Sequence, residues 1–177
     1  VDVIINRRLR KVDVGIFSYF DGEKHVSRYF LNAVYIGLGA RIVRITNETR
    51  RFWGIPLLSY LASLFLVAFE RKMHRMHLKV NGEHIRGRLM AVAVGSAKGY
   101  GLTPSAVPYN GWLDVSLIYR PELRQLVPGL WMLQQGRLLN HKNVKPYRTR
   151  EVKILRAQNA EISLDGRVLF DKHFPID

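Results

Sequence analysis

Few side chains in the sequence are suited to chemistry, and the clearest pair lies near its end. Asp165 and Arg167 flank Gly166. A carboxylate can orient a hydroxyl group or accept its proton, whereas arginine keeps its charge and only donates hydrogen bonds. Asp-Gly is also a common hairpin turn. The residues alone therefore leave a catalytic and a purely structural interpretation open.

A glycine-rich segment is the second candidate. Gly95, Gly99 and Gly101 follow a run of small apolar residues and precede Thr103. Glycine lets backbone amides approach an anion closely, so this loop is a candidate for lining a substrate. A loop that only needs a permissive backbone explains the glycines equally well. No Gly-x-x-x-x-Gly-Lys-Ser/Thr pattern occurs, which excludes a Walker A phosphate loop in this sequence.

Metal and thiol chemistry have little support in this sequence. It contains no cysteine, so disulfides, thiolate metal sites and cysteine nucleophiles are excluded. His74 and His77 are three residues apart at the expected end of a helix, without a carboxylate or cysteine companion. Because a metal ion needs more ligands than two histidines supply, we expect a solvated basic edge and no metal there.

The charge balance points to an anionic partner. Lys and Arg total 28 against 14 Asp and Glu, giving a formal net charge of +14. Such an excess suits an acidic lipid leaflet or nucleic acid. The sequence has no nucleic-acid-binding signature, and aromatic residues interleave the basic clusters sparsely, so no specific nucleic acid is expected. The two clusters are Arg7, Arg8, Arg10 and Lys11, and Arg137, Lys142, Lys145, Arg148, Arg150, Lys153 and Arg156, the second relieved only by Glu151.

Turn dipeptides indicate the elements that would position these residues. Asp21-Gly22, Asn81-Gly82, Asn110-Gly111 and Asp165-Gly166 each lie beside apolar runs. Asn-Gly and Asp-Gly supply the positive φ angles of a type I′ hairpin, so four such pairs predict a mainly antiparallel β domain. The predicted strands cover residues 12–19, 26–36, 76–80, 89–94, 113–119, 152–154, 162–164 and 168–170.

Two segments have helical character. Residues 121–139 begin with proline and place apolar residues near a spacing of 3.6, and Pro128 is expected to kink or split this helix. Residues 56–72 follow an uncharged run that extends from Trp53 to Phe69. That run predicts a core helix; a membrane-interface helix and a short spanning helix remain alternatives.

The chain is long enough for one domain, which we take as residues 1–177. Composition is that of a globular protein, with 47% hydrophobic and 24% charged residues. Residues 1–6 have the pattern of a strand already under way, without an initial methionine or a signal-peptide pattern. We therefore expect a piece of a longer protein.

Three groups of residues, taken together, are similar to a known family. The first is residues 30–32 with 36–40; the second is residues 99–101, 103–106 and 110–115; the third is Leu164-Asp165-Gly166. In their order and spacing they resemble the diacylglycerol kinase and sphingosine kinase family of lipid kinases, which is related to the NAD kinases. The resemblance spans residues 30–167, and it implies that a strand turns into the first helical segment within the first group. It implies a C-terminal, two-sheet antiparallel β-sandwich with two helical insertions.

The resemblance also implies roles for particular residues, and here the sequence departs from the family. The family's general base is the Glu of Asp-Gly-Glu, and Arg167 occupies that position. Asp165 could replace it, another carboxylate such as Asp171 could serve, or the protein could bind lipid without phosphorylating it. Asn110 stands where the family has the Asp of a magnesium-binding loop. A neutral amide is a weaker magnesium ligand, so no metal site is expected, and Asp114 is expected to face solvent or a hydrogen bond.

The sequence therefore predicts the lipid-substrate half of an ATP-dependent lipid kinase. Its ATP-binding N-terminal domain, with a Gly-Gly-Asp-Gly-Thr motif, would be absent, so ATP and Mg²⁺ would bind mainly there and this fragment alone would be inactive. The expected partners are a lipid substrate and an acidic membrane surface, at a cytoplasmic, peripherally membrane-associated location, with a homodimer also compatible. Alternatives are a non-catalytic lipid- or membrane-binding protein, a nucleic-acid-binding domain and, below these, an NAD-kinase-like enzyme. The predicted substrate-binding residues are Gly99, Gly101, Thr103, Leu61 and Phe65.

Overall fold

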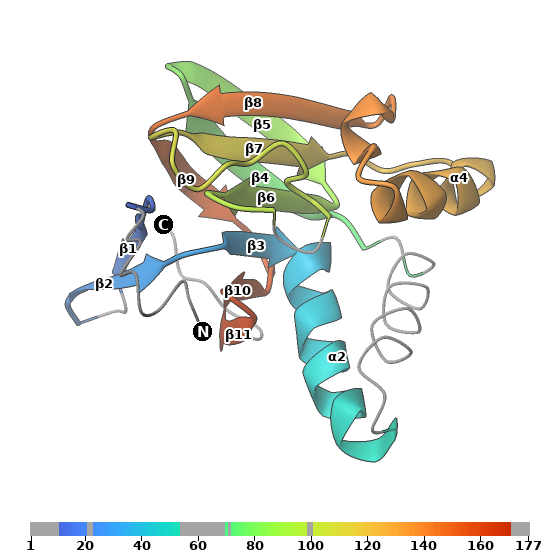
Figure 1. Ribbon diagram of the computed structural model, residues 1–177, viewed down its shortest axis with the longest axis horizontal. Coiled ribbons are helices and arrows are strands. Elements are labelled where there is room, and N and C mark those ends of the chain that lie inside the picture. The colour runs from blue at the N-terminus through green and yellow to red at the C-terminus, as the bar shows by residue number, and fades with distance from the viewer. Residues whose placement is uncertain (1–10, 21–22, 54–69, 71, 99–100, 171–177) are drawn as a thin grey trace, which may run out of the picture.

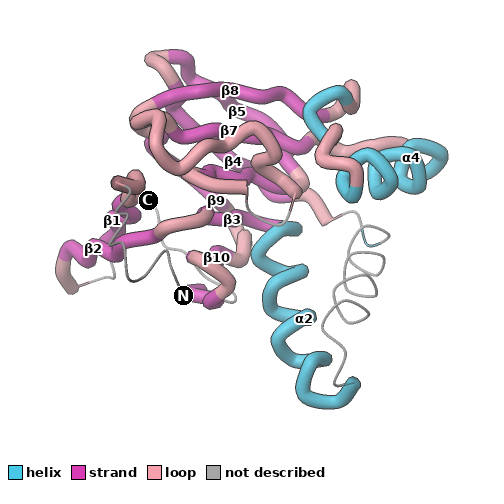
Figure 2. The backbone as a smooth tube through the Cα atoms, viewed as in Figure 1, coloured by secondary structure: helices cyan, strands magenta, loops and turns pink. Residues whose placement is uncertain are grey.

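The computed structural model describes residues 11–20, 23–53, 70, 72–98 and 101–170, and they form a mainly β domain (Figures 1 and 2). A six-stranded sheet and a three-stranded sheet pack face to face, and a two-stranded hairpin lies at one side. The strands are β1 Gly15–Phe20, β2 His25–Phe30, β3 Ala33–Gly37, β4 His74–Val80, β5 Glu83–Leu89, β6 Ala91–Gly95, β7 Leu113–Ile118, β8 Val144–Thr149, β9 Val152–Ala157, β10 Ile162–Leu164 and β11 Arg167–Phe170. The helices are α2 Leu38–Trp53, α4 Leu123–Gln134 and the 3₁₀ turn Leu138–Asn140.

The six-stranded sheet has the order β11-β10-β3-β6-β7-β8, and every neighbouring pair is antiparallel. Its central strands β3 and β6 are buried along their whole length. Helix α2 covers one face through Ala40, Ile42 and Val43, which pack with Tyr35 and Ala93. A strand covered on both faces has no need of polar alternation, which explains the continuous apolar run of β6.

The three-stranded sheet has the order β5-β4-β9 and covers the other face. Strand β4 alternates strictly: Met76, Leu78 and Val80 are buried, whereas Arg75 and Lys79 are exposed. The buried side chains meet Val92, Val94 and the other inward residues of the large sheet in one core. This arrangement confirms the prediction of a mainly β, two-sheet antiparallel sandwich.

Two strands predicted as continuous are in fact divided. Residues 26–36 form β2 and β3, which belong to different sheets and are separated at Leu31 and Asn32. The apolar run 89–94 is divided at Met90, whose amide donates to Ile118 O and whose carbonyl accepts from Leu38 N. In both places, the backbone N–H and C=O groups at the break form hydrogen bonds with other segments of the chain. Strand pairing therefore passes from one sheet to another at these residues.

The hairpin predictions were right at two pairs and wrong at one. Asn81-Gly82 joins β4 to β5 with φ angles of 51° and 83°, and Asp165-Gly166 joins β10 to β11 with 45° and 82°. Asn110-Gly111 is not a hairpin turn but part of the loop before β7, where the Asn110 side chain accepts a hydrogen bond from Trp112 N. A side chain that bonds its own backbone two residues on makes a turn without paired strands. Asp21-Gly22 lies outside the described residues.

The helix predictions needed more correction. Helix α4 begins where expected, with a Glu122–Gln125 capping box, but it ends at Gln134, and Pro128 does not split it. The resemblance implied a helical segment beginning within residues 36–40, and helix α2 begins there, but its extent to Trp53 was missed. Arg41 and Arg44 interrupt an apolar pattern that is carried by Leu38, Ile42 and Ile45. The predicted helix over 56–72 lies largely outside the described residues. Within the described part of the chain, no helix is long and apolar enough to cross a membrane.

Strand β8 was also missed, since Pro146 and two cations, Lys145 and Arg148, make its sequence look like a loop. It forms the edge of the six-stranded sheet and pairs only with β7. Proline has no amide hydrogen to donate to a ladder, so an edge strand is where it is tolerated.

Candidate functional site

One end of the six-stranded sheet collects residues from all three motif groups, whereas residues 36–40 of the first group lie at its other end. Strand pairing places the start of β3, the end of β6 and the start of β7 in line, through Ala33↔Gly95 and Gly95↔Asp114. The end of β10 joins them through Leu164↔Val34. The loops that follow or precede these positions are residues 31–32, 96–98, 101–112 and 165–166, and we name this end of the sheet the loop edge.

The Asp165 carboxylate organises the loop edge by accepting three consecutive backbone amides. Its Oδ2 accepts from Leu31 N at 2.7 Å, and its Oδ1 accepts from Asn32 N at 2.8 Å and Ala33 N at 3.0 Å. The Asp165 amide in turn donates to Ala33 O at 3.0 Å. Hydrogen bonds to a charged acceptor are the strong kind, so Asp165 fixes the break between β2 and β3. About four lone-pair sites exist on a carboxylate, which leaves one of them open.

Ser96 also holds the break between β2 and β3, by bonding to the carbonyl oxygens of this segment. Its amide donates to Asn32 O at 2.9 Å and its hydroxyl donates to Leu31 O at 2.8 Å. The glycine-rich segment is thereby attached to the Asp165 turn through Leu31 and Asn32. Arg167 begins β11 opposite Leu164, and it is exposed, with no carboxylate partner among the described residues.

The predicted substrate-binding residues of the glycine-rich segment have packing roles in the described structure. Thr103 is fully buried, and its hydroxyl donates to Ala97 O at 3.0 Å. Gly95 lies behind it: a Cβ there would approach Thr103 Oγ1 to 2.5 Å. Gly101 has a φ of 75° and lies so close to Leu133 of α4 that a Cβ would come within 3.0 Å of it. Gly99 lies outside the described residues, so its predicted role remains untested.

Asp114 is buried and fully engaged, so the alternative in which it faces solvent is wrong. It accepts from the Ser105 hydroxyl and from Arg148 Nε at 2.8 Å. The hydrogen bond and charge of Asp114 raise the pKa of Arg148 above its ordinary value. The pair ties the loop before β7 to strand β8.

The loop edge does not fit a magnesium ion. The Asn110 amide oxygen already accepts from Trp112 N, the Asp114 carboxylate is paired with Arg148, and the Asp13 carboxylate accepts from Gly111 N at 2.8 Å. Magnesium requires oxygen ligands that are open to it. Across the described ranges no group of three or more potential metal ligands occurs.

His74 and His77 do not form a site together. They lie on strand β4 rather than at a helix end, and they face opposite sides of the sheet: His74 is buried, whereas His77 is partly exposed. Burial is the main reason that the pKa of His74 is lowered, partly offset by its hydrogen bond to the Gln158 carbonyl.

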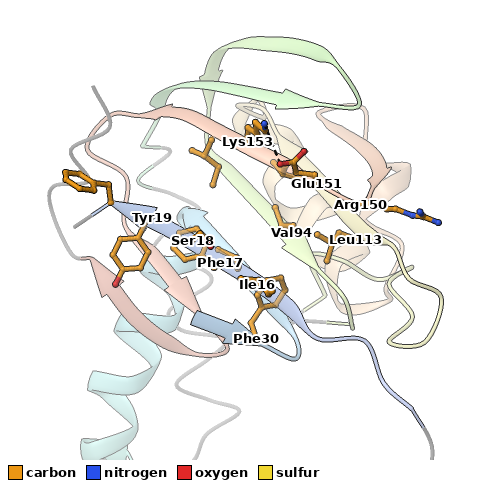
Figure 3. A pocket seen from close by; sticks show the side chains of 14 residues that line it. Ile16, Phe17, Ser18, Tyr19, Phe30, Val94, Leu113, Arg150, Glu151 and Lys153 are labelled. Atoms are coloured by element: carbon orange, nitrogen blue, oxygen red, sulfur yellow. Dashed lines mark ion pairs between the residues drawn. The ribbon is translucent and has the colours of Figure 1, made fainter. Parts of the chain in front are cut away.

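A cavity of about 470 Å³ opens beside the loop edge (Figure 3). Its walls come from the β1–β2 hairpin on one side and from the six-stranded sheet and β9 on the other. This volume lies within the range of about 300–1,000 Å³ typical of small-molecule sites. The apolar lining residues are Ile16, Phe17, Phe20, Phe30, Val34, Val94, Leu113, Val152 and Ile154, and the remaining lining residues are Ser18, Tyr19, Arg150, Glu151 and Lys153.

The rim of this cavity is charged, whereas its depth is apolar. Lys153 Nζ lies 3.6 Å from Glu151 Oε1, and the Arg150 guanidinium lies over the Trp112 ring at 4.8 Å. Figure 3 shows Phe17 and Phe30 on one side of the space, Val94 and Leu113 on the other, and Arg150 extending away from it. A space with an apolar interior and a polar mouth suits a molecule that has an apolar tail and a polar head.

Sequence reasoning missed this cavity because no motif marks it. Its lining residues come from six strands, β1, β2, β3, β6, β7 and β9, together with residues 150 and 151, and only the pairing of the strands brings them together. One sequence feature does relate to the cavity. Gly15 lies opposite Phe30 across the hairpin, and the Phe30 ring occupies the space that a side chain at position 15 would need. The predicted lipid-contacting residues Leu61 and Phe65 lie outside the described residues.

Comparison with known proteins gives the same fold and adds a family. Residues 32–172 match the model of the YegS C-terminal NAD kinase beta sandwich-like domain. The chain belongs to this family. That match covers most of the chain and includes the loop edge except for Leu31, so the resemblance expected from the motifs is confirmed.

Curated relatives and solved structures agree with this assignment. A "Probable lipid kinase YegS-like" of Pseudomonas savastanoi pv. phaseolicola is 29% identical over 96% of the chain, and one of Pseudomonas syringae pv. syringae is 28% identical over the same share. The chain spans only 55% of each of these relatives. A putative diacylglycerol kinase from Bacillus anthracis has a TM-score of 0.56 at 16% identity, covering 92% of this chain and 49% of its own. Yeast NADH kinase has a TM-score of 0.51 at 12% identity, covering 97% of this chain and 41% of its own, and both structures share the fold.

The first prediction concerns the Asp114–Arg148 pair. Arg148→Ala leaves the buried Asp114 carboxylate with only Ser105, and we expect the free energy of unfolding to fall by about 1–3 kcal/mol in a urea titration. Lys145→Ala is the matched control, because Lys145 pairs with Glu83 at 3.6 Å and both side chains are more than half exposed. An exposed pair contributes about 0–1 kcal/mol. Equal losses in the two variants would contradict this role of Asp114.

Proposed function

We propose that this chain is the lipid-substrate domain of an ATP-dependent lipid kinase of the YegS and diacylglycerol kinase type. In this proposal the cavity between the β1–β2 hairpin and the sandwich holds the apolar part of the lipid. The loop edge then positions the lipid hydroxyl for phosphoryl transfer. Nucleotide binding belongs to the part of the protein that the curated relatives have and this chain lacks.

The observation that supports this proposal most strongly is a juxtaposition. The segments at residues 31–33, 96–98, 101–112 and 165–167 come together on one sheet edge, and the apolar cavity shares that edge through Val34, Val94 and Leu113. A lipid kinase needs a place for an apolar chain next to a place for a hydroxyl and a phosphate. No single segment of the sequence supplies both.

The residues of this chain act in the proposal by binding and positioning. Asp165 and Ser96 hold residues 31–33 so that this backbone forms a rigid part of the substrate site. Phosphoryl transfer depends largely on positioning and on charge stabilisation. Arg167 adds a positive charge that has no carboxylate partner among the described residues, so it is suited to binding a phosphate oxygen.

ATP and Mg²⁺ enter the proposal only through the family relation. The carboxylates of the loop edge are already engaged by protein donors, so we route no step through a metal held by this chain. A magnesium–nucleotide complex would supply the phosphoryl group, and its ligands would come from the missing half.

A non-catalytic lipid-binding protein is the second candidate, and Arg167 is the observation that favours it. Arginine cannot accept a proton from a substrate hydroxyl. Asp165 has both carboxylate oxygens engaged by amides, and Asp171 lies outside the described residues. Measurements on the full-length protein separate the two candidates.

The cavity prediction uses the exposed residue Ile16 at the mouth. Ile16→Glu places a carboxylate where the proposal puts an apolar chain, and we expect the KM for a long-chain lipid hydroxyl to rise about tenfold, since a poorly compensated charge costs roughly 1–3 kcal/mol. The assay is phosphate transfer from labelled ATP with Mg²⁺ and a panel of neutral lipids, using the full-length protein. The KM for ATP is expected to stay unchanged.

Val127→Glu is the control for this experiment, because Val127 is equally exposed but lies on α4, away from the cavity. A lipid KM that is unchanged in Ile16→Glu, or raised equally in Val127→Glu, would show that the cavity does not bind the lipid. Vesicle binding without phosphate transfer to any lipid would favour the non-catalytic candidate.

The second functional prediction concerns Arg167. Arg167→Glu restores the family's acidic residue at an exposed position, so the fold should tolerate the change. If the full-length protein is a kinase limited by the lack of a base, kcat rises by about 10²-fold or more in this variant, which is the usual contribution of general base catalysis. A lower kcat in Arg167→Glu would show instead that the positive charge takes part in the reaction.

A further inference from the structure

The outer face of the three-stranded sheet carries only cations, histidines and one leucine along its strands. Arg75, His77 and Lys79 project from β4, whose even-numbered residues are buried in the core. On β5 the side chains of this face are His84, Arg86 and Arg88, whereas the exposed Glu83 at the start of the strand is paired with the inward-facing Val80. On β9 the exposed side chains are Lys153, Leu155 and Arg156. We name the six Lys and Arg residues and the two histidines of this set the cationic face.

Strand pairing places like charges directly opposite each other on this face. Arg75 is the cross-strand partner of Arg88, and Lys79 is the partner of Lys153. His77 lies between Arg86 on one neighbour and Arg156 on the other. Like charges in directly opposite positions destabilise a sheet, so folding alone does not explain this arrangement. An external anionic partner does, because it would neutralise the repulsion.

Among the described residues, the carboxylates near the cationic face lie at its ends and do not neutralise its centre. Glu83 is at the β4–β5 turn and pairs with Lys145 at 3.6 Å, and Glu151 precedes β9 and pairs with Lys153 at 3.6 Å. At the centre, Arg86 Nε donates to His77 Nε2 at 3.3 Å, and His77 Nε2 lies 3.0 Å from His84 Nδ1. Reduced solvation, followed by the charges of Arg86 and His84, lowers the pKa of His77, as expected for a neutral ring among cations.

We propose that the cationic face docks the protein on the surface of an anionic lipid bilayer. This inference rests on the proposed lipid kinase function, because a lipid substrate is presented by a membrane. Each cation close to an acidic membrane contributes about 1 kcal/mol to binding. A second copy of the chain is a poor occupant, since a symmetric dimer through this patch would place the same cations against each other.

Nucleic acid is the other anionic macromolecule to consider, and the face favours it less. Among its exposed strand residues there is no Phe, Tyr or Trp, so single-stranded bases would find no aromatic side chain on which to stack. The experiment below includes it as an outcome.

The test uses the full-length protein and two double variants with the same change in net charge. Arg88→Glu with Arg156→Glu alters the cationic face without touching a residue that lines the cavity. Arg137→Glu with Lys142→Glu is the control, because both residues are exposed and lie between α4 and β8. Binding is measured by sedimentation with phosphatidylcholine vesicles that contain or lack phosphatidylglycerol, at several salt concentrations.

We expect the wild-type protein and the control variant to bind the anionic vesicles, with binding weakened by salt. The face variant should bind at least roughly thirtyfold more weakly, which corresponds to two lost cations. Its thermal midpoint should rise by roughly 1–3 °C, because Arg88→Glu places a carboxylate opposite Arg75. Weaker binding by a protein that is no less stable cannot be attributed to misfolding.

Equal weakening in the two variants would overturn the proposal, because net charge and not this face would then decide binding. Wild-type protein that fails to bind anionic vesicles would overturn it as well, and so would a duplex nucleic acid that binds more tightly than the vesicles. Kinase activity on lipid in neutral detergent micelles is measured in parallel. If vesicle binding depends on the cationic face but no variant has kinase activity, the docking surface is supported and the catalytic function is rejected. The two proposals can therefore fail independently.

Discussion

The candidate site depends on one carboxylate that binds three consecutive backbone amides. Residues 31–33 connect the β1–β2 hairpin to the centre of the six-stranded sheet. Their N–H groups donate to a side chain and not to a neighbouring strand. Asp165 accepts all three, and Ser96 bonds the carbonyl groups of the same segment. Backbone donors left without acceptors are costly, so this contact fixes where the chain leaves one sheet and enters the next. The glycine-rich segment and the β10–β11 turn are held in place by the same bonds.

The cavity follows from this constraint. Because strand pairing breaks at residues 31–32, β1 and β2 form a sheet of their own, and this hairpin lies at one side of the sandwich. The space between hairpin and sandwich is lined by apolar side chains at its base and by Arg150, Glu151 and Lys153 at its mouth. An apolar pocket, a rigid polar edge and an outer cationic face are the features that a domain acting on membrane lipids would combine.

The sequence predicted those parts that local rules determine. The Asn81-Gly82 and Asp165-Gly166 turns, the alternation of β4 and the buried run of β6 follow from backbone conformation and from burial of one or two faces. It did not predict the division at residues 31–32, because the amides there bond to a side chain more than 130 residues away. The extent of helix α2 and the whole of strand β8 were missed because Arg41, Arg44 and Pro146 hide their patterns, and tertiary packing outweighs those local signals. The cavity and the cationic face needed strand pairing, which no local pattern encodes.

Amide hydrogen exchange at residues 31–33 tests most directly whether Asp165 holds the candidate site together. The full-length protein would be compared with Asp165→Ala and with Asp13→Ala, since Asp13 accepts a single amide from the same region. We expect exchange at residues 31–33 to become about 10–100 times faster in Asp165→Ala, as the loss of buried or charge-assisted hydrogen bonds implies, while β7 remains protected. Asp13→Ala should change only the loop around Gly111. Unchanged protection at residues 31–33 in Asp165→Ala would contradict the central role of this carboxylate.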